Sequence, residues 1–248
     1  MRDAEALILA EDAARRAGAM LRERFAAAST LSAEGRDIKL FEDSASQDLI
    51  VERLAGSGLP VLAEEQGARA PEVLDAPAAF VVDPLDGSFN FSRGLDYCAV
   101  AIALLRGGAP SAGVIYDFLR DRLYAGAHDV SARCNGAPMR VSQVRERGQA
   151  VLATGFPVNR DYSEAALKSF AEQMSAYKKI RMIGSAASSL ALVAAGIVDV
   201  YHEENIMLWD VAAGLAIVEA AGGAVKTEPS RSIPRALTVT AASCTDLL

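Results

Sequence analysis

The sequence predicts a layered α/β protein whose two halves share one cleft. Three observations support this. The N-terminus carries an amphipathic helical pattern, the short apolar runs between residues 97 and 127 are too close together for parallel crossovers, and strand and helix patterns alternate after about residue 148. We therefore expect residues 1–147 and 148–248 to form the two halves of one compact unit, with the functional site between them.

The first half opens with a helix expected over residues 3–27. Apolar residues recur there at helical spacing, with charged residues off the stripe. Residues 28–47 are polar and rich in small side chains and are expected to form a loop, and a helical pattern resumes over 48–55. Apolar runs predict the strands of this half, which are expected at 60–64, 79–83, 97–105, 112–117 and 122–127.

The second half alternates strands with helices, which is typical of layered α/β folds. Strands are expected at 150–154, 179–183, 197–201, 224–226 and 236–241. Helices are expected at 162–176, 186–195 and 209–222.

Composition favours a soluble globular protein. The chain has 248 residues, 51% of them hydrophobic, and a formal net charge of -7, which argues against nucleic acid as a partner. The charged N-terminus has no signal-peptide pattern, and no apolar run is long enough to cross a bilayer. Three cysteines without paired spacing, Cys98, Cys134 and Cys244, argue against a disulfide scaffold and suit a reducing cytoplasm.

The strand expected at 79–83 ends in two aspartates three residues apart, Asp83 and Asp86. Pro84 stiffens the turn between them, so the two acids are held near one another. Clustered carboxylates repel one another and resist desolvation, and a cation between them removes both costs. Gly87 permits close backbone approach, and Ser88 begins a short helix whose N–H groups favour an anion. The pattern predicts metal-assisted phosphate chemistry; the alternative is a polar turn with an ordinary helix cap.

Two further acidic positions adjoin apolar sequence. Glu64 and Glu65 end a second apolar run, and Asp210 opens a long apolar helix. Taken singly, the glutamates would be a solvated strand end and Asp210 a helix cap. If the three clusters converge, their oxygens suit Mg²⁺, Mn²⁺ or Ca²⁺, whereas the two isolated histidines argue against zinc.

Four segments together resemble the inositol monophosphatase family of magnesium-dependent phosphomonoesterases. These are Asp83-Pro-Leu-Asp-Gly-Ser-Phe-Asn-Phe91, Trp209-Asp-Val-Ala-Ala-Gly214 with Glu219-Ala-Ala-Gly-Gly223 behind it, the Glu64–Glu65 pair, and Arg181-Met-Ile-Gly-Ser-Ala-Ala187. The resemblance covers nearly the whole chain and implies a five-layered αβαβα sandwich, usually dimeric. It also implies two or three Mg²⁺ ions in each active site.

The resemblance assigns each site residue a role. The metal ligands would be Glu64, Asp83, the Leu85 carbonyl, Asp86 and Asp210. Asp48 would pair with the Ser88 hydroxyl to orient the attacking water, with Glu64 completing the catalytic set. The substrate would contact Asp86, Gly87, Ser88, Gly184, Ser185, Ala186, Glu203 and Asp210.

One segment departs from the family pattern. The stretch from Lys39 to Asp48 is short and lacks the usual Val-Thr pair, which puts a third metal ion and a role for Lys39 in doubt.

The predicted activity is Mg²⁺-dependent hydrolysis of a small phosphate monoester, with inositol monophosphate as the best single candidate. A 3′,5′-bisphosphate nucleotidase, a histidinol phosphatase and a fructose-1,6-bisphosphatase share the same metal core and remain alternatives, although Glu203 favours a polyol. A metal-binding regulatory protein without activity is the non-enzyme alternative. A homodimer, with neither nucleic acid nor a membrane as partner, is expected.

Overall fold

A computed structural model describes residues 1–248 except 26, 28–29, 35–36, 67–72, 74 and 157–160. For residues 30–34, 37–39 and 66 it describes the backbone only. In chain order the longer elements are α1 Asp3–Arg24, β1 Thr30–Glu34, β2 Asp37–Leu40, α2 Phe41–Ala55, β3 Val61–Ala63, β4 Ala78–Asp86, α4 Ser88–Arg93, β5 Ala99–Arg106, β6 Ala109–Asp117, β7 Arg122–Ala127, β8 Val130–Cys134, β9 Ala137–Pro138, β10 Val151–Ala153, α5 Glu164–Ser175, β11 Lys179–Arg181, α6 Ala186–Ala194, β12 Val200–Ile206, α7 Leu208–Ala220, β13 Ala224–Pro229 and β14 Leu237–Ala242.

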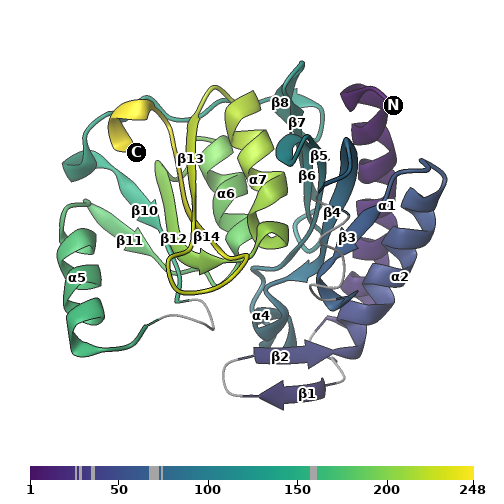
Figure 1. Ribbon diagram of the computed structural model, residues 1–248, viewed down its shortest axis with the longest axis horizontal. Helices are drawn as coiled ribbons and strands as arrows, with labels where there is room; N and C mark the ends of the chain where they lie inside the picture. Colours follow the sequence, from purple (N-terminus) through teal and green to yellow (C-terminus); the bar gives the residue numbers. More distant parts are fainter. Residues whose placement is uncertain (26, 28–29, 35–36, 67–72, 74, 157–160) are drawn as a thin grey trace.

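Five layers follow one another across the molecule (Figure 1). Helices α1 and α2 cover the outer face of a seven-stranded sheet of order β3-β4-β5-β6-β7-β8-β9. Helices α6 and α7 lie between this sheet and a five-stranded sheet of order β11-β10-β12-β14-β13, and α5 lies on the far side. The αβαβα sandwich implied by the resemblance is therefore confirmed.

Strand pairing agrees with the expected meander. In the described part of the seven-stranded sheet, strands β4 to β9 pair antiparallel in sequence order, and β3 joins β4 in parallel. The seven-stranded sheet uses residues before 147 and the five-stranded sheet uses residues after it. The division of the chain into two halves at that point stays a prediction.

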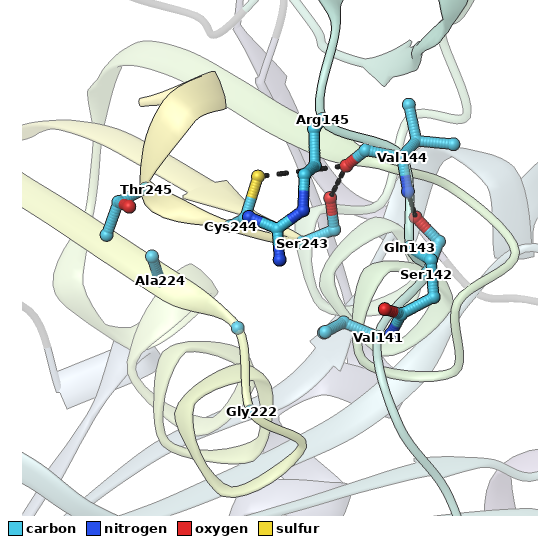
Figure 2. Close-up of a pocket in the computed structure, with 11 residues that line it drawn as sticks. Val141, Ser142, Gln143, Val144, Arg145, Gly222, Ala224, Ser243, Cys244 and Thr245 are labelled. Atoms are coloured by element: carbon cyan, nitrogen blue, oxygen red, sulfur yellow. Dashed lines mark hydrogen bonds between the residues drawn. The ribbon is translucent and has the colours of Figure 1, made fainter.

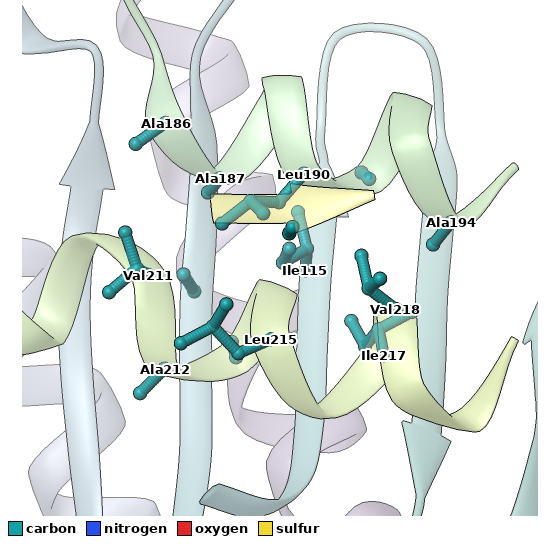
Figure 3. Close-up of a cluster of buried hydrophobic side chains, with 14 of the residues drawn as sticks. Ile115, Ala186, Ala187, Leu190, Ala194, Val211, Ala212, Leu215, Ile217 and Val218 are labelled. Carbon is teal, nitrogen blue, oxygen red and sulfur yellow. The ribbon is translucent and has the colours of Figure 1, made fainter. Parts of the chain in front are cut away.

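Small side chains let α7 lie close to its neighbours. Figure 3 shows Val211, Leu215 and Val218 of α7 facing Leu190 of α6 and Ile115 of β6. A Cβ atom on Gly113 of β6 would lie 2.1 Å from the carbonyl oxygen of Ala213. The close contact of the middle of α7 with β6 therefore depends on this glycine.

The prediction of a loop over residues 28–47 is wrong for the residues that the structure describes. Strands β1 and β2 form a hairpin there, and α2 begins at Phe41, seven residues before the expected start. The buried residues of the first two turns of α2 are polar: Glu42, Asp43, Ser46 and Gln47. Hydrophobic periodicity could not reveal this helix start because the buried face there is not hydrophobic.

Candidate active site

The two aspartates of β4 are buried where the strand meets a bulge. The pairing of β4 with β5 is regular to Asp83 and shifts register before Asp86, so the residues between them leave the ladder. Asp83 Oδ1 accepts a hydrogen bond from the Leu85 amide at 3.0 Å. Local backbone geometry therefore holds one oxygen of Asp83.

Asp86 caps the N-terminus of α6, which comes from the other half of the sequence. Its carboxylate accepts hydrogen bonds from the amides of Ala187 at 2.7 Å and Ala186 at 3.3 Å, and from the hydroxyl of Ser185. Ser185 is itself the N-cap of α6 and accepts from the Ser188 amide at 3.1 Å. A carboxylate at a helix N-terminus is stabilised by the helix dipole. These bonds attach β4 to the central helix layer.

Asp210 lies in the first turn of α7, and its Oδ2 accepts the Met207 amide at 2.9 Å. Asp210 therefore caps the N-terminus of α7, which is the role that its position in the sequence predicts when it is considered singly. The carboxylate also interacts electrostatically with Glu64 and Asp86 and raises the pKa of Asp83. The structure therefore brings Asp210 to the acids of the first sheet.

Glu64 completes the cluster from the 3-10 helix Glu64–Gln66, which follows β3. A hydrogen bond links its carboxyl group to that of Asp83. Burial, and then the charges of Asp43 and Glu65, raise the pKa of Glu64 to about 8. The hydrogen-bonded pair of carboxyl groups is stable when one of them is protonated.

The four acids all have raised pKa values for the same first reason, which is burial. The pKa of Asp86 rises to about 6, and those of Asp83 and Asp210 rise well above their usual range. The repulsion of neighbouring carboxylates adds to the burial effect at Asp83 and Asp210. Such a cluster is stabilised by binding either protons or a cation. The causes of the four pKa shifts are burial, neighbouring carboxylates and hydrogen bonds.

The donor set fits a hard divalent cation, since it consists of carboxylates with carbonyl oxygens nearby. Within the described part of the chain, no three His, Cys, Asp or Glu side chains are already grouped as a metal centre. The aspartates are already engaged with protein donors: Asp83 and Asp210 each through one oxygen and Asp86 through both, while Glu64 pairs with Asp83. A bound cation would have to replace the Glu64–Asp83 hydrogen bond.

The partner of Ser88 is Asp43, and the expectation that it is Asp48 is wrong. Ser88 Oγ lies 2.8 Å from Asp43 Oδ1 and 2.8 Å from the Leu85 carbonyl oxygen. Asp43 is buried, whereas Asp48 lies exposed on the same helix. Because α2 begins at Phe41, the five-residue separation places Asp48 away from the face that packs on β4.

Asp43 is held on both sides of its carboxylate. Its Oδ2 accepts the Leu40 amide at 2.6 Å, which caps α2, and its Oδ1 faces Ser88. Burial raises the pKa of Asp43 to about 6. The capping bond therefore fixes the oxygen that receives the Ser88 hydroxyl.

The turn after Asp86 requires a glycine. Gly87 has φ +85°, and a Cβ there would lie 2.7 Å from the Tyr97 carbonyl oxygen. This left-handed residue reverses the chain so that Ser88 starts α4 directly beside the acids. Leu85 is buried, and its carbonyl faces Ser88.

Asn90 is a functional candidate that sequence reasoning missed. Its Nδ2 donates to the carbonyls of Tyr97 at 2.8 Å and Ile183 at 2.9 Å, with Gly184 at 3.3 Å. It therefore joins α4 to the segment that leads into α6. The residue is part of the quoted aspartate motif, but no pattern in the sequence links it to residue 183.

The three residues expected beside the substrate lead into α6, and two of them, Ser185 and Ala186, contact Asp86. Gly184 has φ +75° and faces the Asn90 amide, Ser185 is engaged with Asp86, and Ala186 is buried. The Ser185 hydroxyl therefore supports a metal-ligand candidate rather than pointing to an open surface.

Glu203 of β12 is buried, and its Oε2 accepts the Tyr201 hydroxyl at 2.9 Å. Lys39 lies in β2, where the structure describes only its backbone.

A hollow lies beside Gly222 and Gly223, just past the C-terminal end of α7 (Figure 2). It measures about 310 Å³, and Arg145 is the one charged side chain among its lining residues. Ser243 Oγ donates to the Val144 carbonyl at 2.8 Å within it. The hollow contains none of the predicted site residues and offers no carboxylate to a cation.

Among the described residues, no helix has the length and apolar character that a bilayer crossing requires. Cys98, Cys134 and Cys244 are free thiols.

Comparisons with known proteins show which family the chain resembles. A model of the inositol monophosphatase family matches residues 3–245. The chain is 36% identical over 196 residues to a Nus factor SuhB from Xylella fastidiosa, covering 78% of this chain and 70% of that protein. It is 33% identical over 245 residues to an inositol monophosphatase from Mesembryanthemum crystallinum, covering 96% and 90%.

A solved structure extends the likeness to three dimensions. The inositol monophosphatase from Anabaena (Nostoc) sp. PCC 7120 matches with a TM-score of 0.82 at 32% identity, over 97% of this chain and 91% of that one. Fold and sequence agree along nearly the whole length. The chain belongs to the inositol monophosphatase family.

Proposed function

We propose that the protein hydrolyses a small phosphate monoester with Mg²⁺, and that inositol monophosphate is the preferred substrate among those considered. The convergence of Glu64, Asp83, Asp86 and Asp210 beside the Gly87–Ser88 turn supports this proposal most directly. Bound divalent ions would neutralise the phosphate, lower the pKa of a bound water and stabilise the leaving oxygen. Two or three ions would be held by these carboxylates and the Leu85 carbonyl.

Asp43 and Ser88 supply the proton path in this proposal. Asp43 Oδ1 accepts the Ser88 proton at 2.8 Å, which leaves the lone pairs of the Ser88 hydroxyl free to accept from a water molecule. The water is then oriented with its own lone pair toward the phosphorus. Asp43 thereby takes the role that the resemblance gave to Asp48, with Glu64 nearby as a second carboxylate.

The amides of Gly87 and Ser88 are proposed to bind the phosphate, beside the acids that bind the metal. Gly184, Ser185 and Ala186 would line the alcohol side of the pocket together with Glu203. A buried carboxylate at position 203 favours an alcohol that carries further hydroxyl groups, because each hydroxyl can donate to it.

Family membership leaves the activity open, since relatives include proteins named Nus factor SuhB as well as inositol monophosphatase. The bisphosphate nucleotidase, histidinol phosphatase and fructose-1,6-bisphosphatase alternatives would use the same acids. A non-catalytic metal-binding protein would also bind Mg²⁺. Phosphate release separates these possibilities.

The test is phosphate release from a panel of phosphate esters, with Mg²⁺ and with a chelator. We expect Mg²⁺-dependent turnover, highest with inositol monophosphate, and loss of turnover in Asp86→Asn. The exposed Asp48→Asn is the matched control, because it makes the same chemical change outside the cluster. A folded Asp86→Asn protein with normal turnover would overturn the proposal, as would a wild-type protein that releases no phosphate from any ester.

We further propose that the protein is a cytoplasmic homodimer. Free thiols are consistent with a reducing compartment. Four large hydrophobic side chains, Leu95, Tyr97, Met182 and Ile197, are exposed around one hollow of about 670 Å³, and such clusters are typical of protein contacts. Light scattering on the purified protein tests the oligomeric state, and a monomeric mass would refute the dimer.

A further inference from the structure

Strand β12 carries two buried polar side chains on one face, Tyr201 and Glu203. They are two residues apart, so both point to the same side of the five-stranded sheet. Tyr201 is fully buried, and Glu203 is 7% exposed. The Tyr201 hydroxyl donates to Glu203 Oε2 at 2.9 Å. A buried carboxylate needs such a donor to offset the loss of water.

The backbone of Gly155 lies against the same carboxylate. A Cβ atom at this position would lie 2.9 Å from both Oε1 and Oε2 of Glu203 and 3.1 Å from Cδ. Any side chain at residue 155 would therefore displace the carboxylate. Tyr201 and Gly155 together restrict where the Glu203 oxygens can lie.

This pair adjoins the metal-ligand candidates. Glu203 contributes to the raised pKa of Asp210, and Asp86 contributes to that of Tyr201. Burial, and then the charge of Glu203, raise the pKa of Tyr201 well above its usual value. The phenol therefore keeps its proton and acts only as a donor to Glu203.

We propose that Tyr201 and Gly155 position the Glu203 carboxylate so that the site selects phosphate esters whose alcohol carries additional hydroxyl groups. Tyr201 is a positioning residue in this scheme, since it acts on the substrate through Glu203. The inference rests on the proposed function and concerns which ester is chosen, whereas the metal cluster decides whether an ester is hydrolysed.

The reason for selectivity is the geometry of a hydrogen bond. A substrate hydroxyl gains most from an acceptor that is already fixed at the right place, because no side-chain entropy is then lost on binding. Without the Tyr201 hydroxyl the carboxylate can move to other partners. The loss falls on binding, so it raises KM for a polyol ester more than it lowers kcat.

The test compares kcat/KM for inositol monophosphate with kcat/KM for phenyl phosphate, whose alcohol carries no further hydroxyl. In Tyr201→Phe we expect the ratio to fall by about tenfold, as for loss of a hydrogen bond to a charged group. Gly155→Ala displaces Glu203 by a different route and should lower the same ratio. Added to Glu203→Gln, Tyr201→Phe should have little further effect, because both changes act on one interaction.

Tyr116→Phe is the matched control, since it also removes a tyrosine hydroxyl bonded to a carboxylate, that of Asp121 at 2.8 Å. Its ratio should match the wild-type ratio. An unchanged ratio in Tyr201→Phe would overturn the inference while leaving the proposed phosphatase activity intact. Equal losses on both esters would also overturn it, by showing a structural role. A wild-type protein that hydrolyses neither ester would refute the proposed function and this inference with it.

Discussion

Replacing Asp43 with asparagine tests the corrected proton path, and the structure specifies the result in some detail. The asparagine oxygen can replace only one of the two carboxylate oxygens. One oxygen now accepts the Leu40 amide at 2.6 Å, and the other accepts the Ser88 hydroxyl at 2.8 Å. If the amide oxygen keeps the helix cap, its NH₂ group faces Ser88.

The Ser88 hydroxyl would then reverse its direction. It would accept from the asparagine NH₂ group and donate to the Leu85 carbonyl, which also lies at 2.8 Å. A lone pair of Ser88 that should accept from water is now occupied, and no carboxylate remains to take up charge. Positioned proton acceptors contribute roughly 10²–10⁴-fold to rates, so we expect kcat to fall at least about 100-fold.

Stability should change much less than activity. The capping bond to Leu40 survives in Asp43→Asn, and the charge-assisted bond to Ser88 becomes a neutral one, which costs about 1 kcal/mol. Phosphate release at saturating Mg²⁺ measures kcat, and thermal unfolding measures stability. Asp48→Asn serves as the control because this aspartate is exposed and five residues further along α2. Normal turnover in a folded Asp43→Asn protein, or a large loss in Asp48→Asn, would refute the reasoning.

Two further predictions concern stability. In the metal-free protein, Asp86 has its pKa raised from 3.8 to about 6 and Glu64 from 4.5 to about 8. Both are raised on folding, so the native state binds more protons than the unfolded state between about pH 4 and 8, and stability should fall as pH rises through that range. Asp86 alone accounts for about 3 kcal/mol. Denaturant unfolding at pH 5 and pH 8 with a chelator should show the loss, and Mg²⁺ should reverse it at pH 8; equal stability at both pH values would contradict the burial account. Separately, Gly113→Ala places a Cβ 2.1 Å from the Ala213 carbonyl and should destabilise by about 1–3 kcal/mol. Gly56→Ala, at a helical φ of -62° with open space around it, should be neutral or stabilising, and equal melting temperatures for the two variants would argue against the close contact of α7 with β6.

Much of the fold could be predicted because its strands and helices follow the apolar pattern. Strands β5 and β7 are almost continuously buried, β6 is buried from Ala112 to Tyr116, and the close spacing of the three strands required antiparallel pairing. Helix α7 is apolar on most sides because it lies between two sheets, and its expected bounds, 209–222, are near the observed Leu208–Ala220. Layer order, in contrast, came from the resemblance, because periodicity does not reveal which face each helix covers.

The errors lie where polar side chains are buried. Helix α2 presents Asp43, Ser46 and Gln47 to the interior, so its first two turns resemble a loop in the sequence. The prediction that Asp48 is the loop-end aspartate depends on a helix start at residue 48, whereas α2 begins at Phe41. A helical register drawn back from Ile50 and Leu54 would have found Asp43 and Gln47 on the same face.

Other contacts of the site lie beyond the reach of a single sequence. Asp86 caps a helix about 100 residues away, and Asn90 donates to a carbonyl 93 residues away. The Tyr201–Glu203 pair could have been found, since alternate residues of a strand share a face. Its contact with Gly155 could not, because it depends on how the strands of the second sheet are placed.

The central claim is that carboxylates from three distant segments bind the same divalent ions. Crystals grown with Mn²⁺ test it most directly, because the anomalous signal of manganese locates each ion without assumptions about its ligands. We predict peaks coordinated by Asp83, with Glu64 on one side and Asp86 and Asp210 on the other. Strong peaks elsewhere, or none within bonding distance of Asp83 and Asp210, would contradict the account.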